Sequence, residues 1–115
     1  MKSKPLQYFM HYGPAAFRLE LAGDLDSDGA RRLERDWRRA SSLIGNRTLI
    51  VDLTFVTGVE EEGRTLLARW HAAGAQFIAH SKVSRALAEA IAGEPVSEFA
   101  SAGYASANRT WLPHY

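Results

Sequence analysis

Two short apolar runs separated by a helical pattern constrain the fold of this chain most strongly. Residues 48–53 (Thr-Leu-Ile-Val-Asp-Leu) and 75–80 (Ala-Gln-Phe-Ile-Ala-His) are too short for helices and are typical of buried central strands. Between them, Leu66, Leu67 and Trp70 recur at helical spacing, and Gly74 ends the pattern. A strand, a helix and a strand in this order predict a parallel strand pair with a right-handed crossover.

An aromatic hairpin is predicted ahead of this unit. Residues 6–12 (Leu-Gln-Tyr-Phe-Met-His-Tyr) favour a strand, and Gly13-Pro14 is a turn signal. In residues 17–21, apolar side chains alternate with Arg18 and Glu20, which is typical of a half-buried strand antiparallel to the first. Residues 23–26 (Gly-Asp-Leu-Asp) then predict a turn.

Two further amphipathic helices complete the pattern. We expect Ser27 or Asp28 to cap the first one, and Gly45-Asn46 to end it. Its apolar stripe consists of Ala30, Leu33, Trp37, Ala40 and Ile44. The last helix is expected to begin at the Ser81 cap, to carry an apolar stripe and to stop at Gly93 and Pro95. That stripe consists of Val83, Leu87 and Ile91.

The resulting order is β-β-α-β-α-β-α. It predicts an α/β fold with a mixed four-stranded sheet covered mainly on one face by helices. We expect one domain over residues 1–95, followed by a tail over residues 96–115 that contains four aromatic residues. The tail is expected to pack on the domain or on a neighbouring subunit, or to stay largely disordered.

Composition excludes several classes of protein. The chain has 115 residues, a net charge of +1 and no cysteine, which argues against disulfides, thiolate chemistry and a general polyanion-binding field. No apolar run approaches the roughly 20 residues needed to span a bilayer, and no signal-peptide pattern follows Met1. We therefore expect a cytoplasmic protein that binds neither membrane nor nucleic acid.

Three consecutive acids, Glu60-Glu61-Glu62, precede the second helix. Negative charge at a helix start is stabilised by the macrodipole, so capping and solubility are one interpretation. The other is an acidic recognition surface, because open α/β sheets tend to place ligand sites at the carboxyl ends of their strands. No histidine or metal-ligand spacing accompanies the acids, so we expect no catalytic site, no metal and no cofactor.

The first helix carries an arginine-rich side opposite its apolar stripe. A solvated face is the first interpretation of this side, and a docking face for an acidic partner is the second, with nucleic acid third. The arginines that we assign to a secondary interaction face are Arg31, Arg35 and Arg38.

Four segments together resemble the STAS domain, the family of anti-sigma factor antagonists. Each is short, but their order and spacing along the predicted strands and helices make the match fairly specific. They are residues 17–26 (Phe-Arg-Leu-Glu-Leu-Ala-Gly-Asp-Leu-Asp), 49–53 (Leu-Ile-Val-Asp-Leu), 59–63 (Val-Glu-Glu-Glu-Gly) and 73–75 (Ala-Gly-Ala). Gly23 and Asp26 match the family's turn before the first helix, and Asp52 matches the acid in its central strand.

The chain departs from the family at the regulatory motif. In the family, a loop reading Asp-Ser-x-Gly precedes the second helix, and an anti-sigma factor that is also an ATP-dependent kinase phosphorylates its Ser or Thr. Here Glu60 stands at the Asp position, Glu61 at the phospho-acceptor position, and Gly63 is retained. Glu61 is therefore a degenerate phosphosite carrying one permanent negative charge, where phosphoserine adds about −1.5 to −2.

The resemblance implies a non-catalytic module of bacterial signal transduction and transcription regulation. Its partner would be an anti-sigma factor-type ATPase or kinase, or another signalling protein, and a homodimer is a further option. Its contact surface would be the loop over residues 56–63 with the exposed start of the second helix. The site residues that we predict are Asp26, Thr57, Glu60, Glu61, Glu62, Gly63 and Arg64. The alternative is a small-molecule or nucleotide sensor with a crevice near Gly23, Asp52 and Glu60.

Overall fold

A computed structural model of the chain describes residues 4–96. Four strands form one sheet in the order β1-β2-β3-β4. β1 pairs with β2 antiparallel, whereas β2 with β3 and β3 with β4 are parallel pairs, so the sheet is mixed as expected. The elements are β1 (Gln7–Tyr12), β2 (Ala16–Leu25), α1 (Ser27–Ser41), β3 (Thr48–Val59), α2 (Glu61–Ala72), β4 (Gln76–Ile78) and α3 (Lys82–Ala92).

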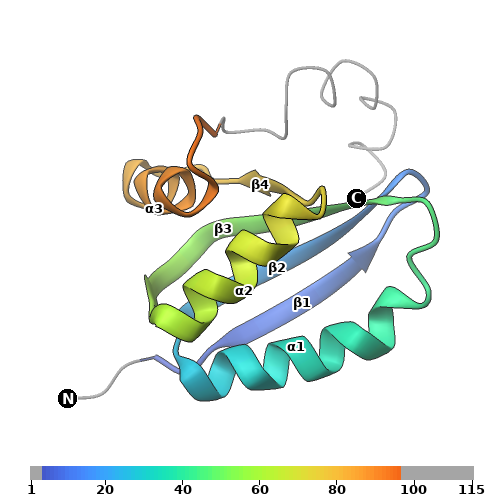
Figure 1. Ribbon diagram of the computed structural model, residues 1–115, viewed down its shortest axis with the longest axis horizontal. Coiled ribbons are helices and arrows are strands. Elements are labelled where there is room, and N and C mark those ends of the chain that lie inside the picture. The colour runs from blue at the N-terminus through green and yellow to red at the C-terminus, as the bar shows by residue number, and fades with distance from the viewer. Residues whose placement is uncertain (1–3, 97–115) are drawn as a thin grey trace.

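The helices cover one face of the sheet, where the main core lies. α1 and α2 run side by side across this face, and α3 lies toward β4 (Figure 1). Every second side chain of the central strands points into this core, as Leu19 and Leu21 of β2 and Val51 and Leu53 of β3 do. All three helices contribute buried apolar side chains to the same cluster, which confirms the predicted two-layer architecture.

Both central strands are longer than the sequence indicated. β2 runs through the predicted turn to Leu25, and β3 continues beyond Leu53 to Val59, so residues 56–59 are strand and not loop. The register between β2 and β3 shifts at two points, and these irregularities accommodate Thr54 and Thr57 without breaking the pairing. The expected loop is therefore reduced to a direct passage from β3 into α2.

Gly23 lies inside β2 and not in a turn. Its φ is +93°, and a Cβ at this position would lie 2.5 Å from the Pro5 carbonyl oxygen. The next residue, Asp24, donates its backbone N–H to the Lys4 carbonyl at 3.0 Å. The glycine thus permits the segment before β1 to cross close to the β2 backbone.

The helix ends differ in part from the prediction. Asp26, and not Ser27 or Asp28, is the N-cap of α1, and its Oδ1 accepts the Gly29 backbone N–H at 2.7 Å. α1 ends at the Ser42 cap, ahead of the predicted Gly45-Asn46 signal, because turns fill residues 42–46. The Ser81 cap of α3 and its Gly93 end are confirmed.

The apolar stripe of α3 was wrong at one position. Val83 is 77% exposed, whereas Ala88 and Ile91 are buried. Ser84 is buried as well, because it completes a reciprocal cap with Ser81, in which each side chain accepts the other residue's backbone N–H. The prediction chose the larger apolar side chain, but the cap orients the first turn of α3 differently.

Candidate functional site

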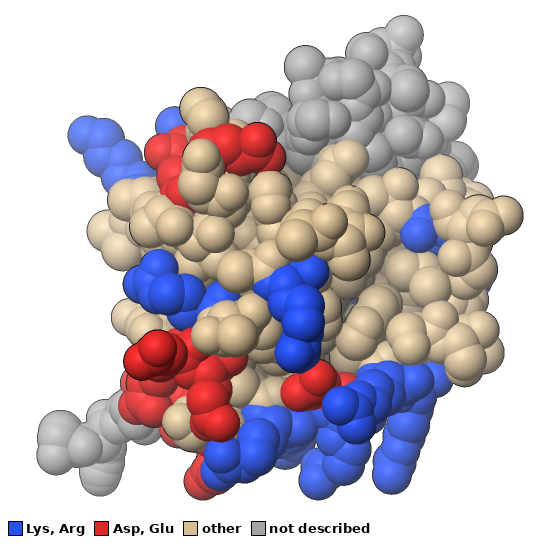
Figure 2. Space-filling model, viewed as in Figure 1, with Lys and Arg blue, Asp and Glu red and all other residues tan. Residues whose placement is uncertain are grey.

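The starts of α1 and α2 lie side by side, because β2 and β3 are parallel and end at the same edge of the sheet. Glu60 donates its backbone N–H to the Leu25 carbonyl at 2.9 Å and so joins the two strand ends. The carboxylates gathered here are Asp26, Asp28, Glu60, Glu61 and Glu62, and we call them the acidic corner. Figure 2 shows acidic side chains at this end of the two helices and basic ones along α1.

The Glu60 side chain forms hydrogen bonds with the start of α1 and not with α2, the helix that it precedes. Its Oε1 accepts the backbone N–H of Ser27 at 3.3 Å and the Ser27 hydroxyl at 3.5 Å, and it makes no capping hydrogen bond to α2. The start of α1 is therefore neutralised by two carboxylates, those of Asp26 and Glu60. At the start of α2, the helix dipole is compensated by the charges of Glu61 and Glu62 in the first turn.

Glu62 is held in a surface ion-pair network. Arg31 donates to its Oε1 at 3.1 Å and to Asp28 Oδ1 at 2.5 Å. All three side chains are more than half exposed, so these pairs orient side chains but add little to stability. Arg31, predicted to belong to a secondary face, is thus part of the acidic corner.

Glu61 is the exposed carboxylate of the corner with no hydrogen bond or ion pair to any residue between 4 and 96. It is the first residue of α2, where the positive end of the helix dipole favours an anion. Glu60 and Glu62, beside it in sequence, are exposed too. The corner thus presents fixed negative charge to the outside.

Gly63 is buried where the first turn of α2 packs against Leu25 of β2. A Cβ at this position would lie 2.5 Å from Leu25 Cγ and 3.0 Å from the Leu25 carbonyl oxygen. A larger residue would therefore push the first turn of α2 away from the sheet. The structure gives Gly63 a packing role that sets the position of Glu61 and Glu62.

The remaining predicted site residues occupy different places. Arg64 is exposed on α2, and the Thr57 hydroxyl donates to the Asp24 carboxylate at the end of the paired strands. Arg38 lies farther along α1, where it shares the Glu34 carboxylate with Arg69 of α2 at 3.4 and 2.7 Å. Arg35 contacts Asp36 at 3.7 Å and faces outward.

Asp52 is buried and belongs to the sheet, not to the acidic corner. Its Oδ2 accepts from Arg18 at 2.9 Å, and its Oδ1 accepts the backbone N–H and the hydroxyl of Thr54 at 3.0 and 2.6 Å. A buried carboxylate with three donors is a satisfied structural group. The predicted sensor crevice, which combined Asp52 with Gly23 and Glu60, therefore does not form as one site.

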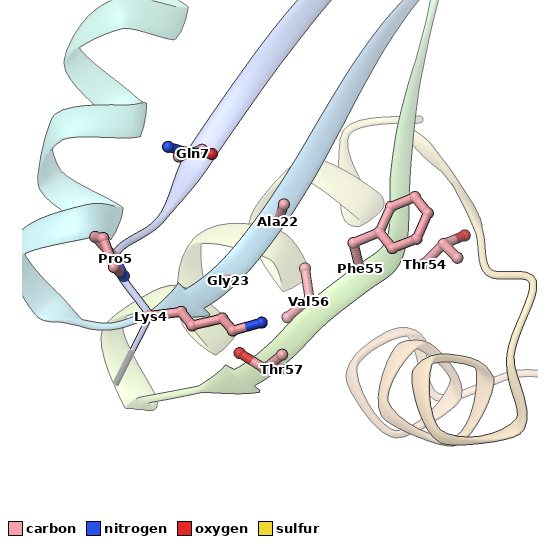
Figure 3. A pocket seen from close by; sticks show the side chains of 9 residues that line it. All are labelled: Lys4, Pro5, Gln7, Ala22, Gly23, Thr54, Phe55, Val56 and Thr57. Carbon is pink, nitrogen blue, oxygen red and sulfur yellow. The ribbon is translucent and has the colours of Figure 1, made fainter. Parts of the chain in front are cut away.

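A groove does exist near Gly23, on the side of the sheet away from the core. Its volume is about 600 Å³, and Figure 3 shows Lys4 reaching across it toward Thr57, with Phe55 alongside. Phe55 is 59% exposed, which is high for a phenylalanine. Sequence reasoning missed this groove, because it depends on the length of β3 and on the crossing of residues 4 and 5.

Within residues 4–96, no three His, Asp or Glu side chains are placed to hold a metal ion. Over the same range, no helix has the length and apolar character needed to cross a membrane. The aromatic tail of the prediction, residues 97–115, lies outside the described residues.

Two solved structures are similar to this chain over nearly its whole length. An anti-sigma factor antagonist from Mycobacterium paratuberculosis aligns with a TM-score of 0.65 and 15% identity, covering 93% of this chain and 94% of that one. An uncharacterised protein with a SpoIIAA-like fold from Shewanella loihica aligns with a TM-score of 0.55 and 13% identity, covering 99% and 98%. No family model and no curated protein matches the chain.

These likenesses define the class of fold. The chain has the SpoIIAA-like, or STAS-like, fold of an anti-sigma factor antagonist, with the predicted order of strands and helices. The resemblance drawn from the sequence segments is thus confirmed at the level of the fold.

Proposed function

We propose that this chain is a non-catalytic regulatory module that binds a protein partner through the acidic corner. The observation that carries the proposal is Glu61, an exposed carboxylate fixed at the first residue of α2. By the resemblance, this is the position of the phosphorylatable Ser or Thr. One of the similar structures is an anti-sigma factor antagonist, which supports an anti-sigma factor-type ATPase or another signalling protein as the partner.

The charge at this position is permanent in the proposed module. Phosphorylation would add about −1.5 to −2 charges at a helix start and could be reversed, whereas Glu61 carries one charge at all times. The chain would then be either a constant mimic of the phosphorylated form or a binder of partners that never used phosphorylation. In both cases the extent of partner binding depends on the amounts of the chain and of its partner, and not on phosphorylation by a kinase.

The partner surface should be basic. Glu60, Glu61 and Glu62 lie together on the outside, and Arg31 offsets the charges of Glu62 and Asp28 only. Such a surface speeds association with a cationic partner, and the effect weakens as salt screens the charges. Transcription regulation is the role that we propose for the resulting complex.

The test is affinity capture from native lysate, followed by titration of the captured partner against variants. We expect Glu61→Gln, which removes only the charge, to weaken binding about three- to tenfold through slower association. Glu61→Ser should weaken it similarly and should create a substrate for any cognate kinase. Glu94→Gln is the control: it removes another exposed carboxylate, which lies beyond the end of α3 and pairs with His71 of α2.

The proposal is wrong if Glu61→Gln and Glu61→Ser both bind the partner as the native chain does. Binding by the Glu94→Gln control should stay at the native level. A loss of the same size in that control would point to a general charge effect and would equally contradict a role for the acidic corner.

A second candidate function, small-molecule sensing, is supported by the groove beside Phe55. Its volume of about 600 Å³ is in the range of ligand sites, although it is open on the sheet surface. A thermal-shift screen with nucleotides and small metabolites separates the two candidates. Stabilisation that is lost in Phe55→Ala supports sensing, and no stabilisation by any compound leaves protein docking as the function.

A cytoplasmic location and pairing of two copies remain predictions. Cell fractionation tests the first, and sedimentation over a range of concentrations tests the second.

A further inference from the structure

The outer edge of β1 is unpaired within the part of the chain that the structure describes. β1 is the first strand of the sheet, and no strand among the described residues pairs with its outer side. Natural edge strands are usually guarded by lysine, proline, inward charges or a bulge. The sequence of β1, Gln-Tyr-Phe-Met-His-Tyr, has none of these residues, and its pairing with β2 runs without a register shift.

A groove of about 410 Å³ runs along β1 where α1 passes over it. Its floor includes Met10, and its open sides carry Tyr12 and Leu43, which are 53% and 58% exposed. Phe9, on the opposite face of the strand, is 54% exposed. A strand added to this edge would thus cover large apolar side chains on both faces of the sheet. We call this surface the β1 groove, lined by Tyr8, Met10, Tyr12, Asp36, Arg39, Ala40 and Leu43.

The rim of the β1 groove is basic. Arg39 lines it, makes no ion pair within residues 4–96 and is exposed, and Arg35 lies one turn earlier on α1. The one acidic group in the lining, Asp36, accepts from the Tyr8 hydroxyl at 2.5 Å and pairs with Arg35 at 3.7 Å, so Arg39 leaves the rim with a net positive charge. Figure 2 shows basic side chains along α1, which begin beside the acidic side chains at its start.

We propose that the β1 groove is a second interaction surface, which binds an extended acidic segment of another protein as an additional strand. Main-chain hydrogen bonds to β1 would supply affinity, and the groove would select apolar and acidic side chains at alternate positions. The surface is separate from the acidic corner, so this proposal goes beyond the partner binding proposed above and does not depend on Glu61.

A second copy of the chain fits this edge poorly. Pairing two β1 strands would bring the basic rims of the two α1 helices together along the seam, and like charges placed opposite each other oppose association. An acidic segment turns the same arginines into attractive contacts. The charge of the rim therefore decides between the two occupants.

A synthetic peptide tests the proposal on the full chain. The probe is an octapeptide with blocked ends. Threonine occupies every second position, and valine and glutamate alternate at the remaining positions. Two control peptides have lysine in place of glutamate, or N-methyl groups that remove the main-chain donors of one edge. We expect amide shift changes in residues 7–12 and 35–43 with the probe alone, and binding that weakens as salt is raised.

Matched variants test the two parts of the surface. Arg35→Glu with Arg39→Glu should weaken binding of the probe about tenfold through charge reversal, while Lys82→Glu, on α3, should leave it unchanged. Leu43→Ser should weaken binding about threefold, while Val83→Ser should not, although Val83 on α3 is an even more exposed apolar residue. Because all five side chains are exposed, loss of folding does not confuse the readout.

The proposal would be overturned by shift changes located away from β1, by equal binding of the lysine peptide, or by full binding of the arginine variants. Dimerisation that grows with concentration and alters the β1 amides would also overturn it, because the occupant would then be a second copy. Loss of binding in Glu61→Gln would do so too, since the probe would then occupy the acidic corner.

Discussion

Gly63 matches a family motif in the sequence, and in the structure it also has a packing role. It permits α2 to start against Leu25 of β2, and so fixes where the carboxylates of Glu61 and Glu62 lie. Its effect on partner binding would therefore be indirect.

Replacing Gly63 with alanine should destabilise the chain by about 1–3 kcal/mol, because the added Cβ overlaps Leu25. Urea unfolding followed by circular dichroism measures the change. Gly58→Ala is the control, since a Cβ there would meet only Asp24 Oδ1 at 3.4 Å. Equal stability of Gly63→Ala and the native chain would contradict the close approach.

At the scale of elements, two hydrogen bonds join β1 and the residue before it to α1. The Tyr8 hydroxyl of β1 donates to Asp36 of α1, and Arg32 of α1 donates to the Leu6 carbonyl at 2.9 Å. Burial, reinforced by the hydrogen bond to Asp36, raises the pKa of Tyr8 from 10.0 to about 12. The same hydrogen bond is the largest influence that lowers the pKa of Asp36 below its usual 3.8.

These shifts predict how stability depends on pH. The pKa of Tyr8 is higher in the folded chain, so its contribution is complete below about pH 10 and is lost as pH rises toward 12. The pKa of Asp36 is lower in the folded chain, so its contribution is present above pH 3.8 and is lost as pH falls through the lowered value. The link between β1 and α1 should thus weaken at both extremes.

Tyr8→Phe should lower the free energy of unfolding by about 1.5 kcal/mol near neutral pH, the low end of the range for a hydrogen bond to a charged group. The difference from the native chain should shrink between pH 10 and 12, and again in acid below pH 3.8. Denaturant unfolding across this pH range measures it. Tyr12→Phe, which removes a more exposed hydroxyl, should match the native chain throughout; a constant Tyr8→Phe difference would contradict the assignment.

At the scale of the whole molecule, the main core is built between Leu6 and Ile91. The sheet contributes Leu19, Leu21 and Leu53 to it, and the helices contribute Leu33 and Leu67, among others. Val96 packs at its margin, and its backbone N–H donates to Glu89 at 3.0 Å. We therefore predict that residues 1–96 are enough for one cooperative core.

A chain ending at residue 96 should therefore fold and unfold in one cooperative transition. Thermal unfolding by circular dichroism and a two-dimensional amide spectrum would show it. A chain ending at residue 86 loses Ala88 and Ile91 from the core and should be strongly destabilised. If the 96-residue chain lacked a cooperative transition, the predicted boundary near residue 95 would be wrong.

The sequence alone determined the order of elements and, apart from the first turn of α3, the buried faces of the helices. These follow from local periodicity: alternation in residues 17–21, the apolar run of residues 48–53, and the helical recurrence of Leu66, Leu67 and Trp70. The parallel crossover followed from chain connectivity. The acidic residues at the start of the second helix could also be predicted as a site, because they are adjacent in the sequence and directly precede a predicted helix.

Tertiary structure decided the features that join distant parts of the chain. The full length of β3 depends on pairing with β2, and the carboxylate of Glu60 caps a helix that begins 33 positions earlier at Ser27. The β1 groove exists only because α1 crosses the edge strand. Periodicity reports which side of an element is buried, but not which distant residue lies against it, and that choice is made by packing.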